Sequence, residues 1–169
     1  MTSFVSSARN SIGGVRLKAL SLVAATLIAA IAVGRTGAAD KAVTEIISTG
    51  NAPRPVGPYS QGVRVRNTLY VAGQIAIDPA TQQMISGASA AEQTQRALAN
   101  VKAIVEAAGM ALVDVVSTTI YVKDLGEFEA INKAYAAFFP SNPPARATVE
   151  VARLPKDAKV EISAIAMKP

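Results

Sequence analysis

An arginine stands at the start of a strand-like segment near the C-terminus, in "PPARATVEVARLP" (143–155). After Arg146, apolar and polar residues alternate, which is typical of a strand with two unlike faces. The alternation places Arg146, Thr148 and Glu150 on one face of that strand. The guanidinium is either solvated or aimed at a ligand, and its planar fork suits the carboxylate of a small acid.

A carboxylate from the last predicted strand, within "KVEISAIAM" (159–167), could work with this guanidinium. If the connection 154–157 holds an even number of loop residues and the two strands pair antiparallel, Glu161 and Ser163 share the face of Arg146. Arg146 would then bind a ligand while Glu161 positions a water molecule. The pattern by itself favours the alternative, a structural ion pair, because such pairs are common in proteins.

The amino-acid composition excludes several kinds of chemistry. The chain of 169 residues contains no Cys and no His, which excludes Cys nucleophiles, thiolate metal sites, Ser-His-Asp triads and His bases. We therefore predict no metal site. The net charge of +5 would suit nucleic acid. However, four of the 17 basic residues precede Asp40 with no acid among them, and the nearly neutral remainder argues against a nucleic-acid partner.

Residues 1–39 are predicted to be a secretory signal peptide. A basic start is followed by the apolar run 19–33 and by small residues, with cleavage expected near Ala38 or Ala39. Cleavage would release an exported, periplasmic protein without stable membrane association. An uncleaved membrane anchor is the second interpretation, although the run is shorter than the roughly 20 residues that a spanning helix needs. An organellar transit peptide is the third.

Residues 40–169 are predicted to form a single domain. Apolar periodicity predicts strands at 43–48, 68–77, 113–125, 146–152 and 158–167. It predicts helices at 89–108 and 126–138. The segment 50–62 is dense in Gly and Pro, so it is predicted to be irregular.

The first helix has the strongest local signals. Ser89 and Glu92 match a capping box, and Gly109 supplies a stop. One helical face is predicted to point inward: Thr94, Ala97, Leu98, Val101, Ile104, Val105 and Ala108. In the second helix the predicted inward residues are Phe128, Ile131, Tyr135 and Phe138.

The order of these elements predicts an α+β protein, with a mixed sheet and two helices on one face. Two helices cannot cover both faces of such a sheet, and the last strand is apolar at both odd and even positions. We therefore expect sheets to pack against each other between subunits of an oligomer.

Five motifs carry a resemblance to a known family. They are "GPYSQG" (57–62), "VAGQIAIDP" (71–79), "ALANVKAIVEAAG" (97–109), "VVSTTIYVKDL" (115–125) and "PARATVEVARLPKDAKVEISAIA" (144–166). In this order they resemble the RidA (Rid/YjgF) family of enamine/imine deaminases over residues 45–168. The resemblance implies a fold like chorismate mutase and a homotrimer with clefts between neighbouring subunits. It also implies hydrolysis of 2-imino acids to 2-keto acids and ammonia, without a metal or organic cofactor.

The resemblance assigns roles to individual residues. Arg146 matches the arginine that binds the substrate carboxylate, and Glu161 matches the glutamate that orients or activates water. Substrate-binding positions are matched by Tyr59, Gly73, Thr148 and Asn132. Phe128 also matches a position in the cleft wall, although a helix-core role is the stronger interpretation for it. Gly73 is alternatively a plain β-bulge, and Tyr59 an ordinary loop residue.

The chain departs from the family pattern at two positions. Thr148 stands where some members carry Cys, and its hydroxyl can still donate a hydrogen bond. Ala72 stands where some members carry Ser, which removes one hydroxyl beside the cleft glycine.

The implied partners are small 2-imino and 2-keto carboxylic acids. A non-catalytic protein that only binds small carboxylates is the second interpretation. An endoribonuclease or translation inhibitor is the third, and the lack of a basic or aromatic stripe argues against it.

Overall fold

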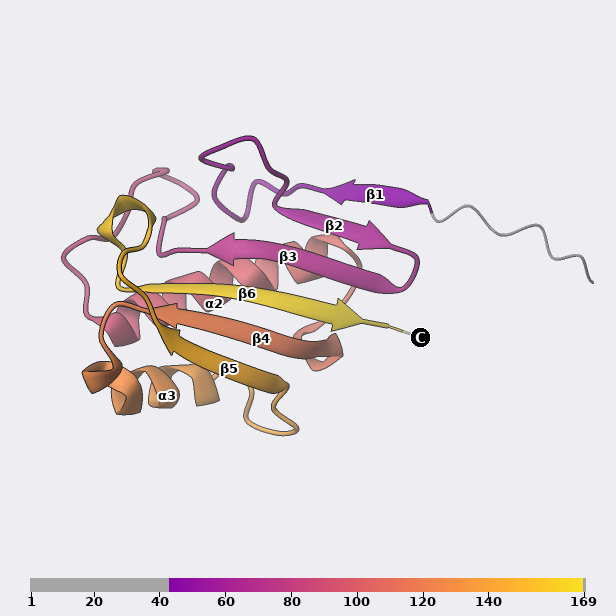
Figure 1. Ribbon diagram of the computed structural model, residues 1–169. Helices are drawn as coiled ribbons and strands as arrows, with labels where there is room; N and C mark the ends of the chain where they lie inside the picture. The colour runs from indigo at the N-terminus through magenta and orange to yellow at the C-terminus, as the bar shows by residue number, and fades with distance from the viewer. Residues whose placement is uncertain (1–42, 169) are drawn as a thin grey trace, which may run out of the picture. The chain divides into compact units, whose positions relative to one another are not determined.

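The computed structural model describes residues 43–168, which form one sheet layer and one helix layer (Figure 1). The predicted leader, residues 1–39, lies outside the described residues. Within residues 43–168, none of the helices is long and apolar enough to cross a membrane.

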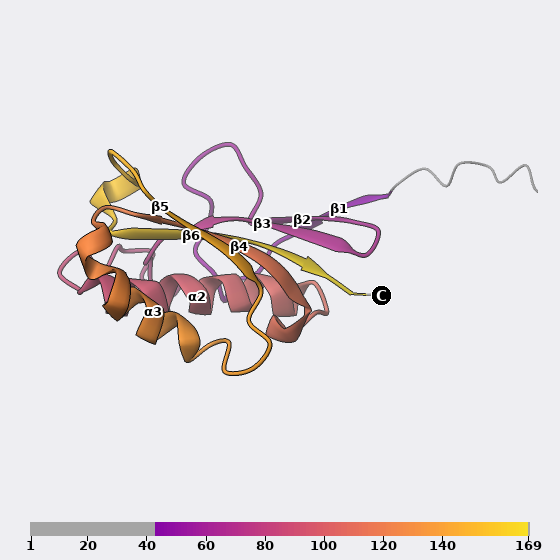
Figure 2. The same cartoon turned by 60° about the horizontal axis from the view of Figure 1, so that its bottom comes forward.

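Six strands form one mixed sheet in the order β1-β2-β3-β6-β4-β5. The strands are β1 (Thr44–Ile47), β2 (Gly62–Val65), β3 (Thr68–Gln74), β4 (Val115–Val122), β5 (Ala145–Glu150) and β6 (Val160–Met167). Neighbouring strands are antiparallel except β4 and β5, which run parallel. Helices α2 (Ala90–Ala107) and α3 (Phe128–Ala136) both lie on one face of the sheet, as predicted (Figure 2).

Helix α2 confirms the local signals in its sequence. The Glu92 N–H donates to Ser89 Oγ at 3.3 Å, and the Glu92 carboxylate accepts from the Ser89 N–H at 2.7 Å, which completes the capping box. Gly109 follows the helix with a φ of 72°, a left-handed conformation that glycine adopts without strain. All seven residues of the predicted inward face are buried.

The inward face of α2 packs against the two central strands, β6 and β3. Alternate side chains of β4 and β6 are buried on the helix side of the sheet: Val115, Thr118, Ile120, Val122, Val160, Ile162, Ala164 and Ala166. Burial of one large aliphatic side chain contributes about 1.5–3 kcal/mol. This core therefore holds the helix layer against the sheet.

Helix α3 confirms only part of its predicted inward face. Ile131 and Tyr135 are buried, and Phe138 is partly buried. Phe128 is 41% exposed, so its prediction as an inward residue, and as helix core, is wrong. Phe128 is the first residue of α3, and its ring lies beside Arg146 of β5 instead of in the core.

Strand β2 is absent from the prediction. It has only four residues, and a basic residue, Arg64, points to its helix side. The guanidinium leaves the core because it donates to the Ala108 carbonyl at 3.0 Å and pairs with Glu45 at 2.6 Å. These contacts satisfy the end of α2. The alternation of Val63, Arg64 and Val65 covers too few residues to have indicated a strand.

The predicted antiparallel pairing of the last two strands is wrong. Strand β4 lies between β5 and β6. The chain passes from β4 through α3 into β5, and a helix that connects two strands in this way makes them parallel neighbours. The connection 151–159 then carries the chain past β4 to reach β6 (Figure 1).

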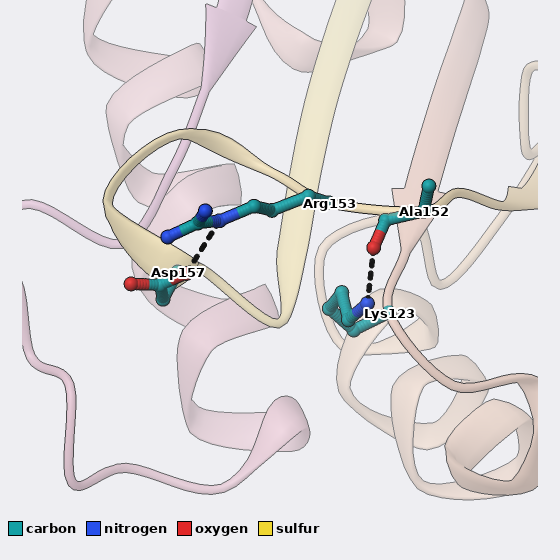
Figure 3. Close-up of polar contacts among 4 residues, drawn as sticks. All are labelled: Lys123, Ala152, Arg153 and Asp157. Carbon is teal, nitrogen blue, oxygen red and sulfur yellow. Dashed lines mark hydrogen bonds and ion pairs between the residues drawn. The ribbon is translucent and has the colours of Figure 1, made fainter.

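Two polar contacts hold this connection (Figure 3). Arg153 pairs with Asp157 at 2.9 Å across the short 3-10 helix Pro155–Asp157, and Lys123 donates to the Ala152 carbonyl. Both contacts are exposed, so each contributes little stability by itself.

The strand order separates the two candidate catalytic residues. Residues paired across a sheet share a face. Arg146, opposite Thr118, therefore lies on the helix-covered face, whereas Glu161, opposite Tyr121, lies on the other face. The prediction that Arg146 shares a face with Glu161 and Ser163 is wrong within one chain.

The second face of the sheet has no helix over it (Figure 2). Exposed large apolar side chains lie on this face: Ile46, Tyr70, Val149 and Met167. An apolar surface of this kind is typical of a protein interface. It supports the expected oligomer, which stays a prediction.

Candidate active site

Glu161 lies at the start of β6, on the uncovered face, next to the loop that precedes β2. Its side chain lines a cavity of about 250 Å³ together with Tyr59, Gln61 and Gly73. The cavity wall comes mainly from this loop and from the end of β3. We call Glu161, Gly73 and Tyr59 the Glu161 half of the site.

Gly73 leaves room for the Glu161 carboxylate. The register between β3 and β6 shifts between Val71 and Gln74, so the β-bulge, the alternative interpretation of Gly73, is present. A Cβ atom added to Gly73 would overlap the Glu161 carboxylate. The carboxylate therefore lies directly over the backbone at this position, and any residue other than glycine would displace it.

Burial affects the charge of Glu161. Desolvation raises the pKa of its carboxyl group above the ordinary value of 4.5. Among the described residues, no cation and no hydrogen-bond donor pairs with this carboxylate. A carboxylate with a raised pKa and free lone pairs is suited to accept a proton from water.

Tyr59 stands at the mouth of the cavity. Its hydroxyl oxygen accepts from the Val56 N–H at 3.2 Å, and the residue is 46% exposed. An ordinary packed loop tyrosine would be buried more completely. The position therefore fits the cleft-lining role that the resemblance implies.

Gln61 fixes the loop that carries Tyr59, although it is not among the predicted site residues. Its buried side chain donates to the carbonyls of Ala52 at 3.2 Å and Pro53 at 2.8 Å, and accepts from the Thr49 N–H at 2.6 Å. One amide therefore satisfies several backbone groups of a loop without regular structure. The sequence signal for it is weak, because nothing in "GPYSQG" indicates that its glutamine is buried.

Arg146 lies on β5, against helix α3. Its guanidinium carbon is 4.8 Å from the Tyr135 ring centroid and 5.9 Å from that of Phe128, which are cation–π distances. The Tyr135 and Thr118 hydroxyl oxygens are 2.8 Å apart, and desolvation raises the pKa of Tyr135, so the phenol stays neutral. Two aromatic rings thus support the guanidinium.

Arg146 has no carboxylate partner among the described residues. Glu150, which shares its face, instead accepts a hydrogen bond from the Leu125 N–H at 2.9 Å. The exposed guanidinium therefore keeps its donors available for a ligand.

Two further predicted site residues, Thr148 and Asn132, also have unused hydrogen-bonding capacity. Thr148 Oγ1 on β5 and Asn132 Oδ1 on α3 are buried without a hydrogen-bond partner among the described residues. Buried polar atoms normally have a partner, so these two atoms mark a place that a ligand or water completes. We call Arg146, Thr148, Asn132 and Phe128 the Arg146 half of the site.

The structure thus gathers the predicted site residues into two groups. The Arg146 half lies on the helix-covered side of the sheet, and the Glu161 half lies on the uncovered side. One chain cannot place both halves around the same small molecule. Residues 43–168 also contain no group of three or more His, Cys, Asp or Glu side chains that could hold a metal ion.

The fold defines a class of small α+β proteins with solved structures. It matches the YjgF gene product from E. coli with a TM-score of 0.71 and 49% identity, covering 74% of this chain and 99% of that one. It also matches E. coli TdcF with bound serine, with a TM-score of 0.71 and 42% identity, covering 74% and 99% of the two chains.

The sequence places the chain within a family. A family model described as "Endoribonuclease L-PSP" matches residues 49–168. A RutC family protein of Saccharolobus solfataricus is 52% identical over 124 residues, 73% of this chain and 98% of the relative. The 2-iminobutanoate/2-iminopropanoate deaminase of Escherichia coli (strain K12) is 49% identical over 129 residues, 75% and 99% of the two chains. The chain belongs to the Rid/YjgF (L-PSP) family.

Replacing Gly73 tests the contact with Glu161. In Gly73→Ala, the new methyl group should push the carboxylate into solvent and lower the pKa of Glu161 towards its ordinary value. The carboxylate ends a flexible side chain, so the free energy of unfolding should fall by only about 1 kcal/mol. Carbon-13 NMR titration and urea unfolding measure the two effects.

Gly87→Ala is the matched control, because a Cβ at Gly87 meets nothing within 4 Å. It should leave the Glu161 titration unchanged. An unchanged Glu161 titration in the Gly73 variant as well would contradict the described contact.

Proposed function

We propose that this protein is a 2-iminobutanoate/2-iminopropanoate-type deaminase, which hydrolyses reactive 2-imino acids to 2-keto acids and ammonia. One observation carries the proposal: a guanidinium and a desolvated carboxylate, both unpaired among the described residues, occupy the family positions of substrate-binding arginine and water-orienting glutamate. The identity of 49% to a deaminase of that name supports it.

The two halves of the site would meet between subunits of a homotrimer. The Arg146 half of one subunit would face the Glu161 half of its neighbour, with the uncovered sheet faces packed together inside the assembly. Two observations support this assembly. The uncovered sheet face carries exposed apolar side chains, and the two halves of the site lie on opposite faces of the sheet within one chain. Three equivalent clefts follow from the three-fold symmetry.

The substrate would be held at its carboxylate. The fork of Arg146 would donate hydrogen bonds to the two carboxylate oxygens, and the rings of Tyr135 and Phe128 would support the guanidinium. The unpaired atoms of Thr148 and Asn132 then complete contacts to the bound acid or its water. Fixed positive charge next to the imine carbon makes that carbon more electrophilic.

Glu161 would activate the water. It accepts a proton from the water while the water oxygen forms a bond to the imine carbon. The electron pair of the C=N π bond moves to the nitrogen, which takes up a proton from solvent water. In the resulting carbinolamine, Glu161 returns its proton to the nitrogen, directly or through a second water, the C–N bond breaks, and ammonia leaves. The remaining hydroxyl gives its proton back to solvent, which leaves the 2-keto acid. Positioning and proton transfer are sufficient, because imines already hydrolyse readily in water.

The description of the matching family model raises RNA hydrolysis as a second candidate. The near-neutral composition after Asp40 and the small cavity beside Glu161 favour a small acid over a polyanion. Cleavage of RNA by the purified protein, lost in the Glu161→Gln variant, would support this candidate instead.

Subunit mixing tests both the reaction and the shared site. An amino-acid oxidase or threonine dehydratase supplies the imine, and its decay and ammonia release are followed. Arg146→Ala and Glu161→Gln should each lower the catalysed rate by about 100-fold. When the two inactive variants are unfolded, mixed equally and refolded together, about a quarter of the clefts should combine two intact halves and regain activity.

Lys102→Ala, which removes an exposed cation on α2, is the charge-matched control for Arg146→Ala and should retain full activity. If the wild-type protein hydrolyses the imine no faster than Arg146→Ala does, the deaminase function is ruled out. The second interpretation, a non-catalytic protein that binds small carboxylates, would then remain. Two inactive variants that regain no activity after they are mixed and refolded together would contradict the shared cleft.

The pH profile reports on Glu161. Only its deprotonated form can accept a proton from water, so kcat/KM should fall as pH decreases through its pKa. Desolvation raises that pKa, so the midpoint of the acid limb should lie above 4.5. The measurement is steady-state kinetics of wild type and Glu161→Gln between pH 4 and 8. The residual rate of the variant should show no fall at acid pH.

We also propose that residues 1–39 direct export to the periplasm, with membrane anchoring or an organellar address as the alternatives. The charge and apolar pattern of these residues supports the proposal. Sequencing the N-terminus of protein recovered from its native cell should give a start near Asp40. Protein that retains Met1 in a soluble fraction would contradict cleavage.

A further inference from the structure

A second arginine lines the cavity that contains Glu161. Arg54 lies in the loop before β2, and its side chain borders the same cavity of about 250 Å³ as Tyr59, Gly73 and Glu161. Neither the motif resemblance nor the mechanism above gives it a role. Its charge is opposite to that of Glu161, so the cavity presents both a proton acceptor and a cation.

The backbone of Arg54 is held from two sides. Its N–H donates to Gln82 Oε1 at 2.9 Å, and the carbonyl of the preceding Pro53 accepts from Gln61 at 2.8 Å. Proline on each side, Pro53 and Pro55, restricts the local φ angles. The loop therefore presents Arg54 from a stiff support, although it has no regular secondary structure.

The Arg54 guanidinium has no acidic partner among the described residues. Two other arginines among residues 43–168 do have an acidic partner: Arg64 pairs with Glu45 at 2.6 Å, and Arg153 pairs with Asp157 at 2.9 Å. Unpaired surface arginines are common, and exposure alone would carry no inference. What distinguishes Arg54 is its combination of a fixed backbone, an unpaired charge and a place on the wall of this cavity.

We propose that Arg54 selects substrates with a second acidic group, that is, 2-imino dicarboxylic acids. The inference rests on the proposed deaminase function. If Arg146 of one subunit holds the α-carboxylate and Glu161 of its neighbour holds the water, the substrate side chain extends along the remaining cavity wall, which includes Arg54. A side-chain carboxylate would pair with its guanidinium fork, whereas a methyl or ethyl group would leave this cation without a partner.

Kinetic selectivity tests the inference. Imines are generated by oxidases from alanine and from glutamate, and kcat/KM is measured for wild type, Arg54→Ala, Arg54→Lys and the control Lys102→Ala. In Arg54→Ala the ratio of kcat/KM for the glutamate-derived over the alanine-derived imine should fall by about fivefold. Arg54→Lys should retain part of the ratio because it keeps the charge, and Lys102→Ala should retain all of it.

Equilibrium binding separates this inference from the proposed reaction. Calorimetry with 2-oxoglutarate and 2-oxobutanoate, stable keto acids, measures recognition without turnover. Arg54→Ala should weaken binding of 2-oxoglutarate about fivefold more than that of 2-oxobutanoate. If no imine is hydrolysed but this binding difference holds, the reaction is wrong and the dicarboxylate preference stands. An equal effect on both acids, or none on either, overturns the role of Arg54.

Discussion

The position of β4 between β5 and β6 is the constraint on which the site depends. Side chains alternate between the faces of a strand, and paired residues share a face, so this order sends Arg146 and Glu161 to opposite sides of one sheet. The order itself comes from α3, whose crossover makes β4 and β5 parallel neighbours. Once the two apolar layers are packed, neither residue can change sides.

The separation of Arg146 from Glu161 also keeps both charged groups free to bind a ligand or water. If Arg146 and Glu161 shared a face of one chain, they could form an ion pair, and the guanidinium would lower the pKa of the carboxyl group. Instead, aromatic rings hold Arg146 on one side, while desolvation raises the pKa of Glu161 on the other. In the proposed trimer, the two groups would meet only where a substrate carboxylate and a water molecule can lie between them.

The Glu161 half is positioned mainly by backbone and amide contacts. Gly73 makes room for the carboxylate, and Gln61 ties together a loop that lacks regular secondary structure. That loop brings Tyr59 and Arg54 to the same cavity. Such supporting contacts matter for function because an active-site geometry is useful only when the groups around it are held in place.

The sequence by itself determined the local elements. The capping box of Ser89 and Glu92, the inward stripe of α2 and the bulge at Gly73 all depend on residues close together in the chain, and the structure has all three. The motifs also indicated the family, and the candidate residues came from those motifs. Strand β2 was missed because its alternating pattern covers only four residues and directly follows a segment dense in Gly and Pro.

Only the tertiary structure decided which of these residues face each other. The sequence between β5 and β6 suggested a simple antiparallel pair, yet the partner of β5 is β4, which is distant in the chain and is reached through α3. Strand pairing over such distances depends on how two layers bury their apolar faces together, which local periodicity does not encode. For the same reason, the sequence could name Arg146 and Glu161 but could not place them on opposite faces.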